Sequence, residues 1–178
     1  MMSAGVKGFG LIEQIVALLA LAALAAIAVP AFRRLLVRHE LQLTQRDYLA
    51  ALQHARNLAV NEQVRTLLCP SRDGRTCNKD HAWQGGWLIG RDPGGQQRVS
   101  GQPLYTGGRH SSSIHILGNV AKPISFKPDG SSAGTLQRLV FCTLEKPPRA
   151  AVLLVALRGR IRAAVPEPED LAKCAAGD

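Results

Sequence analysis

The N-terminal part of the chain carries an apolar run followed by a helical pattern. Residues 15–32 contain no charged residue, and the apolar segment is 24 residues long when it is counted from Phe9. As a helix, this segment would measure about 36 Å, which is enough to cross a hydrocarbon core of about 30 Å. Downstream, apolar and small residues recur at steps of three and four between Leu41 and Ala59, as on one face of a helix. We therefore predict one long helix, with a membrane-spanning part over 9–32 and an amphipathic part over 33–63.

The pattern changes at Val64 to short apolar runs that are broken by glycine and proline, as in antiparallel sheets. Pro128-Asp129-Gly130 is a strong turn signal, and the glycine-rich stretch 92–110 is typical of a mobile loop. The sequence predicts an α+β fold, in which the long N-terminal helix packs on a β-rich domain over 64–165. A polar, acidic tail follows over 166–178. The candidate strands are 64–69, 86–90, 113–117, 124–127, 139–144, 151–157 and 160–165.

The charge of the chain is unevenly distributed. The whole sequence has 22 Lys and Arg against 13 Asp and Glu, but residues 33–165 alone carry 20 basic and 8 acidic residues, a balance of +12. The tail over 166–178 has four acidic residues against Lys173, a balance of −3. A basic domain of this kind favours a polyanionic partner or an anionic surface. A basic surface that serves only solubility explains the charge equally well.

A single carboxylate, Glu13, interrupts the apolar segment near its start. An acidic side chain at the centre of a bilayer costs about 2.5–3.5 kcal/mol, so a compensating charge is expected. Cleavage between Gly8 and Phe9 would create an α-amino group four residues away, on the same helix or on an identical neighbour. Two alternatives stay open: Glu13 lies among the headgroups at the helix N-terminus, or the segment is an ordinary signal peptide that is cleaved after its Ala-rich part.

The residues K-G-F-G-L-I-E at positions 7–13 resemble the processing site of type IV pilins and type II secretion pseudopilins, whose usual form is K-G-F-T-L-I-E. Gly10 replaces the usual Thr, and Pro30 falls where these proteins commonly carry a helix-bending proline. The resemblance implies a leader over residues 1–8, cleavage after Gly8 by a prepilin peptidase, and N-methylation of Phe9. It also implies that Glu13 contacts the N-terminus of a neighbouring subunit in the core of a filament.

Three arginines alternate near the end of the predicted domain. In an extended strand, Arg160 and Arg162 would lie on one face about 6.6 Å apart, which is about two steps of one DNA strand at 3.4 Å each. Arg158 is expected to join them, and Lys146 and Arg149, just before the partner strand, are expected to enlarge the patch. The alternative is an edge strand whose charges only face water and resist aggregation.

Short motifs in the domain resemble the GspH/FimT branch of minor pilins and pseudopilins. They include the residues 68–77, 83–87 and 126–130, and Gly159-Arg160-Ile161-Arg162 near the end. Some FimT-like minor pilins are thought to bind DNA through a C-terminal G-R-x-R element. The resemblance therefore implies that Gly159 to Arg162 bind DNA.

Four cysteines, Cys69, Cys77, Cys142 and Cys174, would lie in an oxidising compartment if the pilin topology holds. Three disulfide connectivities are possible. The loop between Cys69 and Cys77, with Pro70 inside it, makes that pair easy to form, and Cys142 with Cys174 would then pin the tail to the sheet. No C-x-x-C pair occurs, so neither zinc nor another metal is expected.

The candidate catalytic chemistry is weak. Five histidines occur singly, and His110 beside three serines does not by itself specify catalytic geometry. We predict no enzyme activity and no cofactor. The histidines are His39, His54, His81, His110 and His115.

Together these features predict a minor pilin of the type IV pilus that binds extracellular DNA without sequence specificity, for uptake in natural transformation. Its expected partners are DNA phosphates, other pilins and the prepilin peptidase. It would first cross the inner membrane once, with its C-terminal domain in the periplasm, and then join the surface pilus. The alternatives are a GspH-like minor pseudopilin of type II secretion without a DNA role, and a membrane-anchored periplasmic enzyme.

Overall fold

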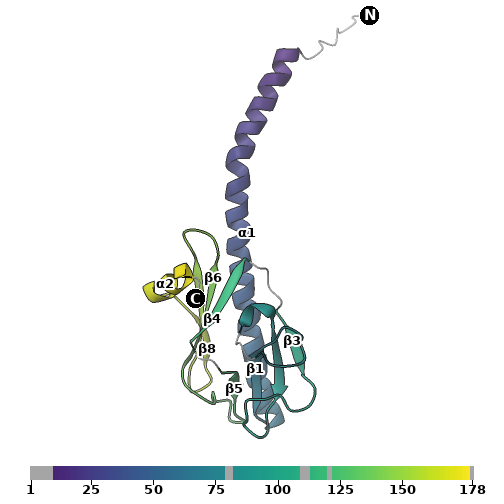
Figure 1. The fold of residues 1–178 in the computed structure, drawn as a ribbon, viewed down its shortest axis with the longest axis vertical. Coiled ribbons are helices and arrows are strands. Elements are labelled where there is room, and N and C mark those ends of the chain that lie inside the picture. Colours follow the sequence, from purple (N-terminus) through teal and green to yellow (C-terminus); the bar gives the residue numbers. More distant parts are fainter. Residues whose placement is uncertain (1–9, 79–81, 109–112, 120–121, 177–178) are drawn as a thin grey trace, which may run out of the picture. The chain divides into compact units, whose positions relative to one another are not determined.

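The computed structural model describes residues 10–78, 82–108, 113–119 and 122–176 (Figure 1). The chain divides into two compact units, residues 1–37 and 38–178. The predicted leader with its Gly8–Phe9 cleavage site lies outside the described residues, as do His81 and His110.

The helix α1 spans Leu11–Glu62 and ends within one residue of the predicted boundary. In the first unit, every residue from 10 to 36 is exposed, and the most apolar 18-residue window of α1 has a mean hydropathy of 2.7. Among the described residues, α1 is the one helix that is long and apolar enough to cross a membrane. Pro30 lies inside it.

In the second unit, α1 buries one stripe of side chains in the main core. Tyr48 is fully buried, its hydroxyl donates a hydrogen bond of 2.6 Å to the carbonyl oxygen of Trp83, and its ring packs edge-to-face against those of Trp83 and Phe141. Burial raises the pKa of Tyr48, so this hydroxyl remains a donor. The stripe repeats at helical spacing and consists of Leu41, Thr44, Tyr48, Ala51, Leu52, Ala55 and Ala59.

The strands form two four-stranded antiparallel sheets, ordered β3-β2-β1-β5 and β4-β6-β7-β8. All seven predicted strands are present, with boundaries within two residues of those expected. The first sheet contains β1 (Thr66–Pro70), β2 (Trp87–Arg91), β3 (Tyr105–Gly107) and β5 (Ile124–Phe126). The second contains β4 (Ile114–Gly118), β6 (Gln137–Thr143), β7 (Ala150–Val155) and β8 (Ile161–Ala164).

The structure corrects the sequence interpretation at the stretch 92–110, which was expected to be a loop throughout. Three of its residues form β3 and pair with β2, so that Gly107 lies opposite Trp87. A Cβ atom at Gly107 would lie 2.8 Å from the Trp87 ring. Tyr105-Thr106-Gly107 contains no apolar run of the kind that marks the other strands, so its pairing with β2 and not the local sequence defines it. A short 3-10 helix, Trp83–Gly85, was also not expected.

The acidic tail, for which no secondary structure was predicted, contains the helix α2 (Pro168–Ala176). Pro168 occupies its first position, where a missing N–H costs nothing. The Asp170 carboxylate accepts a hydrogen bond of 2.7 Å from the backbone N–H of Glu167, which satisfies a donor at the helix start. These signals are short and the helix has only nine residues, which explains why its pattern was missed.

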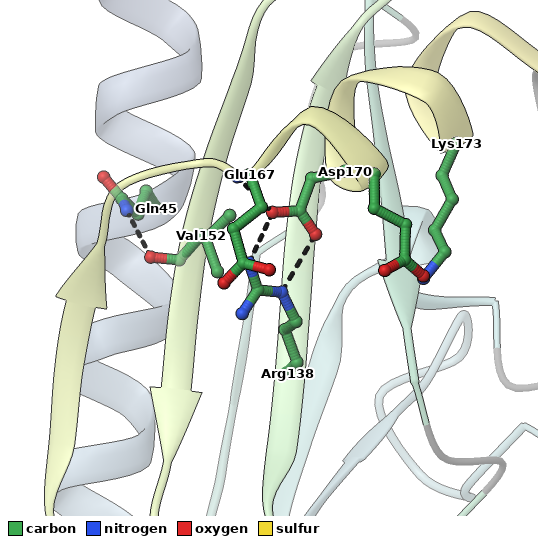
Figure 2. Close-up of polar contacts among 7 residues, drawn as sticks. Gln45, Arg138, Val152, Glu167, Asp170 and Lys173 are labelled. Carbon is green, nitrogen blue, oxygen red and sulfur yellow. Dashed lines mark hydrogen bonds and ion pairs between the residues drawn. The ribbon is translucent and has the colours of Figure 1, made fainter.

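Two links connect α2 to β6. The disulfide Cys142–Cys174 confirms the expected pairing of the tail cysteines. Figure 2 shows the guanidinium of Arg138 facing the Asp170 carboxylate, with Arg138 Nε 2.9 Å from Asp170 Oδ1. The hydrogen bonds from Arg138 hold the pKa of Asp170 below its usual range. Figure 2 also shows Gln45 of α1 donating to the Val152 carbonyl oxygen at 2.9 Å, so β7 is bonded to the long helix.

We predict that Asp170→Asn lowers the free energy of unfolding at neutral pH by about 1–2 kcal/mol, because Arg138 loses its buried charged partner and keeps only the exposed Glu167, 3.2 Å away. The lowered pKa of Asp170 contributes stability above the unfolded value, about 3.9, that disappears as the pH falls through the folded value. The difference between the variant and the wild type should therefore vanish well below pH 4. Chemical unfolding of the detergent-solubilised chain at several pH values measures it.

The matched control is Glu169→Gln, in the same helix turn. Glu169 pairs with Lys173, but its side chain is 73% exposed, and exposed pairs contribute little. Equal effects of the two substitutions at all pH values would contradict the assigned role of Asp170.

Candidate nucleic-acid interface

The hairpin of β7 and β8 carries the three predicted arginines. Its turn is closed by two backbone hydrogen bonds, from the N–H of Ala156 to the Arg160 oxygen at 2.9 Å and from the N–H of Gly159 to the Ala156 oxygen at 2.8 Å. Arg158 and Arg160 belong to this turn. Arg162 lies on β8, opposite Leu154 of β7. All three arginines are exposed. Because β8 is the last strand of its sheet, no further strand covers them there.

Gly159 fixes the position of this turn. Its φ of +74° lies in the left-handed region that favours glycine. A Cβ atom at Gly159 would lie 1.8 Å from the carbonyl oxygen of Gly130, so no other residue fits without a shift. The N–H of Ser132 also donates to the Leu157 oxygen at 2.9 Å. The predicted turn at Pro128-Asp129-Gly130 therefore supports the turn that carries the arginines.

The helix α1 contributes residues to the same place, which was not expected from the sequence. Arg56 Nε donates a hydrogen bond of 3.0 Å to the Gly130 oxygen. A hollow opens beside it, lined by Gln53, Arg56, Asn57, Arg158, Gly159, Arg160 and Ile161. The sequence places Gln53, Arg56 and Asn57 on one side of the helix, away from the buried stripe. Their position on one side of the helix was the only local sign that they act together. It did not predict that this side borders the β7–β8 turn.

The charges of these arginines are not neutralised within the described part of the chain. Other arginines are paired: Arg91 Nε lies 2.6 Å from Glu62 Oε2, and Arg138 contacts Asp170. No such ion pair involves Arg158, Arg160 or Arg162 among the described residues. This leaves a positive surface that is available to an anion.

One acidic residue lies in the supporting turn. The Asp129 carboxylate accepts a hydrogen bond of 2.8 Å from the N–H of Ser131. Hydrogen bonds from Ser131 lower the pKa of Asp129, so it remains charged. Its role is local, because it closes the turn that holds Gly130.

Lys146 and Arg149, which were expected to enlarge the patch, lie away from the turn that carries Arg158 and Arg160. The two residues precede β7, and the antiparallel register places the start of β7 beside the end of β8, with Val152 opposite Ala164. At about 3.3 Å per residue, Arg149 lies about 20 Å along the strand from the turn. Arg149 instead lines a separate hollow with Arg38 of α1.

The remaining candidate cysteines and two of the candidate histidines have defined contacts. Cys69 and Cys77 form the expected disulfide. The ring of His54 packs edge-to-face on that of Tyr105, with 4.4 Å between the ring centroids. His115 lies on β4, opposite Cys142 of β6. Within the described ranges, no group of three or more His, Cys, Asp or Glu side chains is placed to hold a metal ion.

Glu13 lies in the first turn of α1, where its backbone N–H donates to the Gly10 oxygen at 3.0 Å. Its side chain is exposed. Because Gly8 and Phe9 are not described, the pairing of Glu13 with a freed amine remains a prediction.

Comparison with known proteins identifies relatives. The family model described as type II transport protein GspH matches residues 44–159, so the match includes Gly159 and ends before Arg160. No curated protein matches the chain. The type IV minor pilin FimU of Pseudomonas aeruginosa PAO1 is similar in two crystal forms. The first is 24% identical with a TM-score of 0.59 and covers 72% of this chain and 90% of that one. The second is 21% identical with a TM-score of 0.55, covering 70% and 92%.

The minor pseudopilin EpsH of the type 2 secretion system of Vibrio cholerae is also similar. It is 10% identical, with a TM-score of 0.50, and covers 71% of this chain and 98% of that one. At these identities the likeness shows the fold alone. It confirms the predicted type IV pilin-like fold, with a long N-terminal helix packed on antiparallel sheets.

We predict that Gly159→Ala lowers the free energy of unfolding by at least about 2 kcal/mol, because it adds a steric clash to a strained backbone conformation. Gly101→Ala is the matched control: its φ is +77°, but a Cβ atom there has no heavy atom within 4 Å. The control should lose only about 1 kcal/mol. Thermal unfolding measures both, and equal losses would show that the approach to Gly130 contributes nothing.

Proposed function

Because the chain belongs to the GspH family of type II transport proteins, we propose that it is a minor pilin of the type IV pilus that binds extracellular DNA without sequence specificity, for uptake in natural transformation. The family consists of pilin-like structural proteins, so the chain is a minor pilin or pseudopilin and not an enzyme. DNA binding is the further step that we propose.

The observation that carries this step is the set of exposed arginines without acidic partners on the anchored β7–β8 hairpin. A guanidinium group presents a planar fork of donors that fits phosphate oxygens. Arg158, Arg160 and Arg162 would neutralise phosphates and release counterions, so the affinity should fall steeply with salt and depend little on base sequence. The whole chain has only two Trp, two Tyr and four Phe residues, which disfavours a platform for stacked bases.

The N-terminal segment would attach this domain to a filament. We propose cleavage after Gly8, methylation of the Phe9 amine, and neutralisation of Glu13 by the amine of a neighbouring subunit. Before assembly, the apolar part of α1 would cross the inner membrane once, with the second unit in the periplasm. The two disulfides fit an oxidising compartment of this kind. Other pilins and the prepilin peptidase are then the protein partners, and retraction of the pilus would draw bound DNA inward.

A second candidate is a minor pseudopilin of type II secretion that acts in pseudopilus assembly or at its tip, without binding DNA. The description of the matching family model favours it. The two functions differ in whether the arginine hairpin binds DNA, and a direct binding measurement separates them.

We predict that Arg160→Ala with Arg162→Ala weakens duplex DNA binding by at least about tenfold at low salt, because two phosphate contacts are lost. The slope of log affinity against log salt should become smaller by about two. Mobility-shift titration of the detergent-solubilised chain with short duplexes of unrelated sequence measures both quantities. The wild type should bind all of these duplexes similarly.

The matched control removes two charges elsewhere, by Arg46→Ala with Arg149→Ala. Both side chains are exposed and neither lines the hollow beside the hairpin. If the wild type does not bind DNA, the proposed DNA-binding role is wrong and the pseudopilin function remains. Equal losses in the two double variants would show that only the net charge matters.

We predict that the chain isolated from cells with a prepilin peptidase begins at Phe9 and carries one additional methyl group. Intact-mass measurement of the extracted protein tests this. Gly8→Val should retain the leader, because the residue before the cleaved bond is changed, whereas Gly5→Val should still be processed. A wild-type protein that starts at Met1, or beyond residue 32, would contradict the assignment.

A further inference from the structure

The hollow between α1 and the β7–β8 turn contains neutral donors that an arginine patch alone does not require. We propose that this hollow binds one phosphate group of the nucleic-acid backbone, with Gln53 and Asn57 of α1 as hydrogen-bond donors beside Arg158 and Arg160. The inference rests on the proposed DNA-binding function and specifies how that site holds its ligand.

The geometry brings both kinds of donor to one place. Gln53 and Asn57 are four residues apart on α1, so their side chains are neighbours on the helix surface. Both are exposed, and both line the hollow with Arg158 and Arg160. Each amide group has an N–H₂ that can donate to a phosphate oxygen. The phosphate would thus be held from two sides, by the helix and by the hairpin turn.

The charge of the hollow selects an anion. Three of its seven lining residues are arginines and none is acidic. The hollow measures about 460 Å³, within the range of about 300–1,000 Å³ that is typical of small-ligand sites. It therefore has room for a phosphate with its attached sugar, as in a backbone that lies across the hollow.

The walls of the hollow are held together by direct contacts. The half-buried Arg56 donates to the Gly130 oxygen, and Gly159 packs against the same oxygen. Helix, supporting turn and arginine turn therefore meet at one carbonyl group. Since the walls are fixed before a ligand binds, little ordering is required on binding, which favours affinity.

Neutral and charged donors have different experimental signatures. Loss of an arginine lowers the affinity and also reduces the salt dependence, because fewer counterions are released. Loss of an amide lowers the affinity without changing the number of counterions. The salt slope therefore distinguishes a direct amide contact from a displaced arginine.

The test measures duplex DNA binding by the full, detergent-solubilised chain with Gln53→Ala and Asn57→Ala together. We expect the affinity to fall by about tenfold at fixed salt, with the wild-type salt slope. The matched control is Gln42→Ala with Asn61→Ala, which removes the same two amides from exposed positions of α1 outside the hollow. The control should bind as the wild type does.

The outcomes separate this inference from the proposed function. If the amide variant binds like the wild type while Arg160→Ala with Arg162→Ala loses binding, the phosphate pocket is wrong and the DNA-binding role stands. If the amide variant loses affinity and its salt slope also becomes smaller, the proposed amide contacts are wrong as well, because the arginines would then have moved. If the wild type itself does not bind DNA, the proposed function fails first.

Discussion

The packing of one face of α1 into the core of both sheets is the contact on which the rest of the second unit depends. Tyr48 and Leu52 are fully buried there, in one cluster with Leu68 and Ile89 of the first sheet and with residues of the second. Burial of each large apolar side chain contributes about 1.5–3 kcal/mol. The two sheets have no strand in common, so the helix is the element whose buried face joins them.

The same helix positions the candidate site through residues outside its buried face. The residues of α1 that do not enter the core include Arg56, which reaches Gly130, and Gln53, which borders the hollow. The arginine turn is placed by contacts with this helix and with the turn at Gly130. A charged hairpin at a sheet edge would otherwise be an ordinary solvated strand end, and the fixed hollow beside it is what supports a binding role.

A second, smaller cluster closes the other face of the sheet that carries the hairpin. Val140, Val152 and Leu154 pack there with the disulfide of Cys142 and Cys174. The helix α2 is held over this face by the disulfide and by the Arg138–Asp170 pair. The carboxylates of Asp170 and Glu169 in the acidic tail therefore pair with Arg138 and Lys173. These ion pairs do not involve the arginines of the hairpin.

Local sequence patterns specify the long helix, every named strand except β3, and the turn at Pro128-Asp129-Gly130, because periodicity and turn chemistry are local properties. The spacing of Arg160 and Arg162 is a local feature as well, although Arg160 lies in the turn and only Arg162 belongs to β8. The tertiary structure is needed to place Gln53 and Asn57 in one hollow with Arg158, Arg149 far from that turn, and the tail in a helix against Arg138. These relations join segments that are distant along the chain. Strand register, close glycine contacts and ion pairs depend on which surfaces meet, and a local sequence pattern does not encode that.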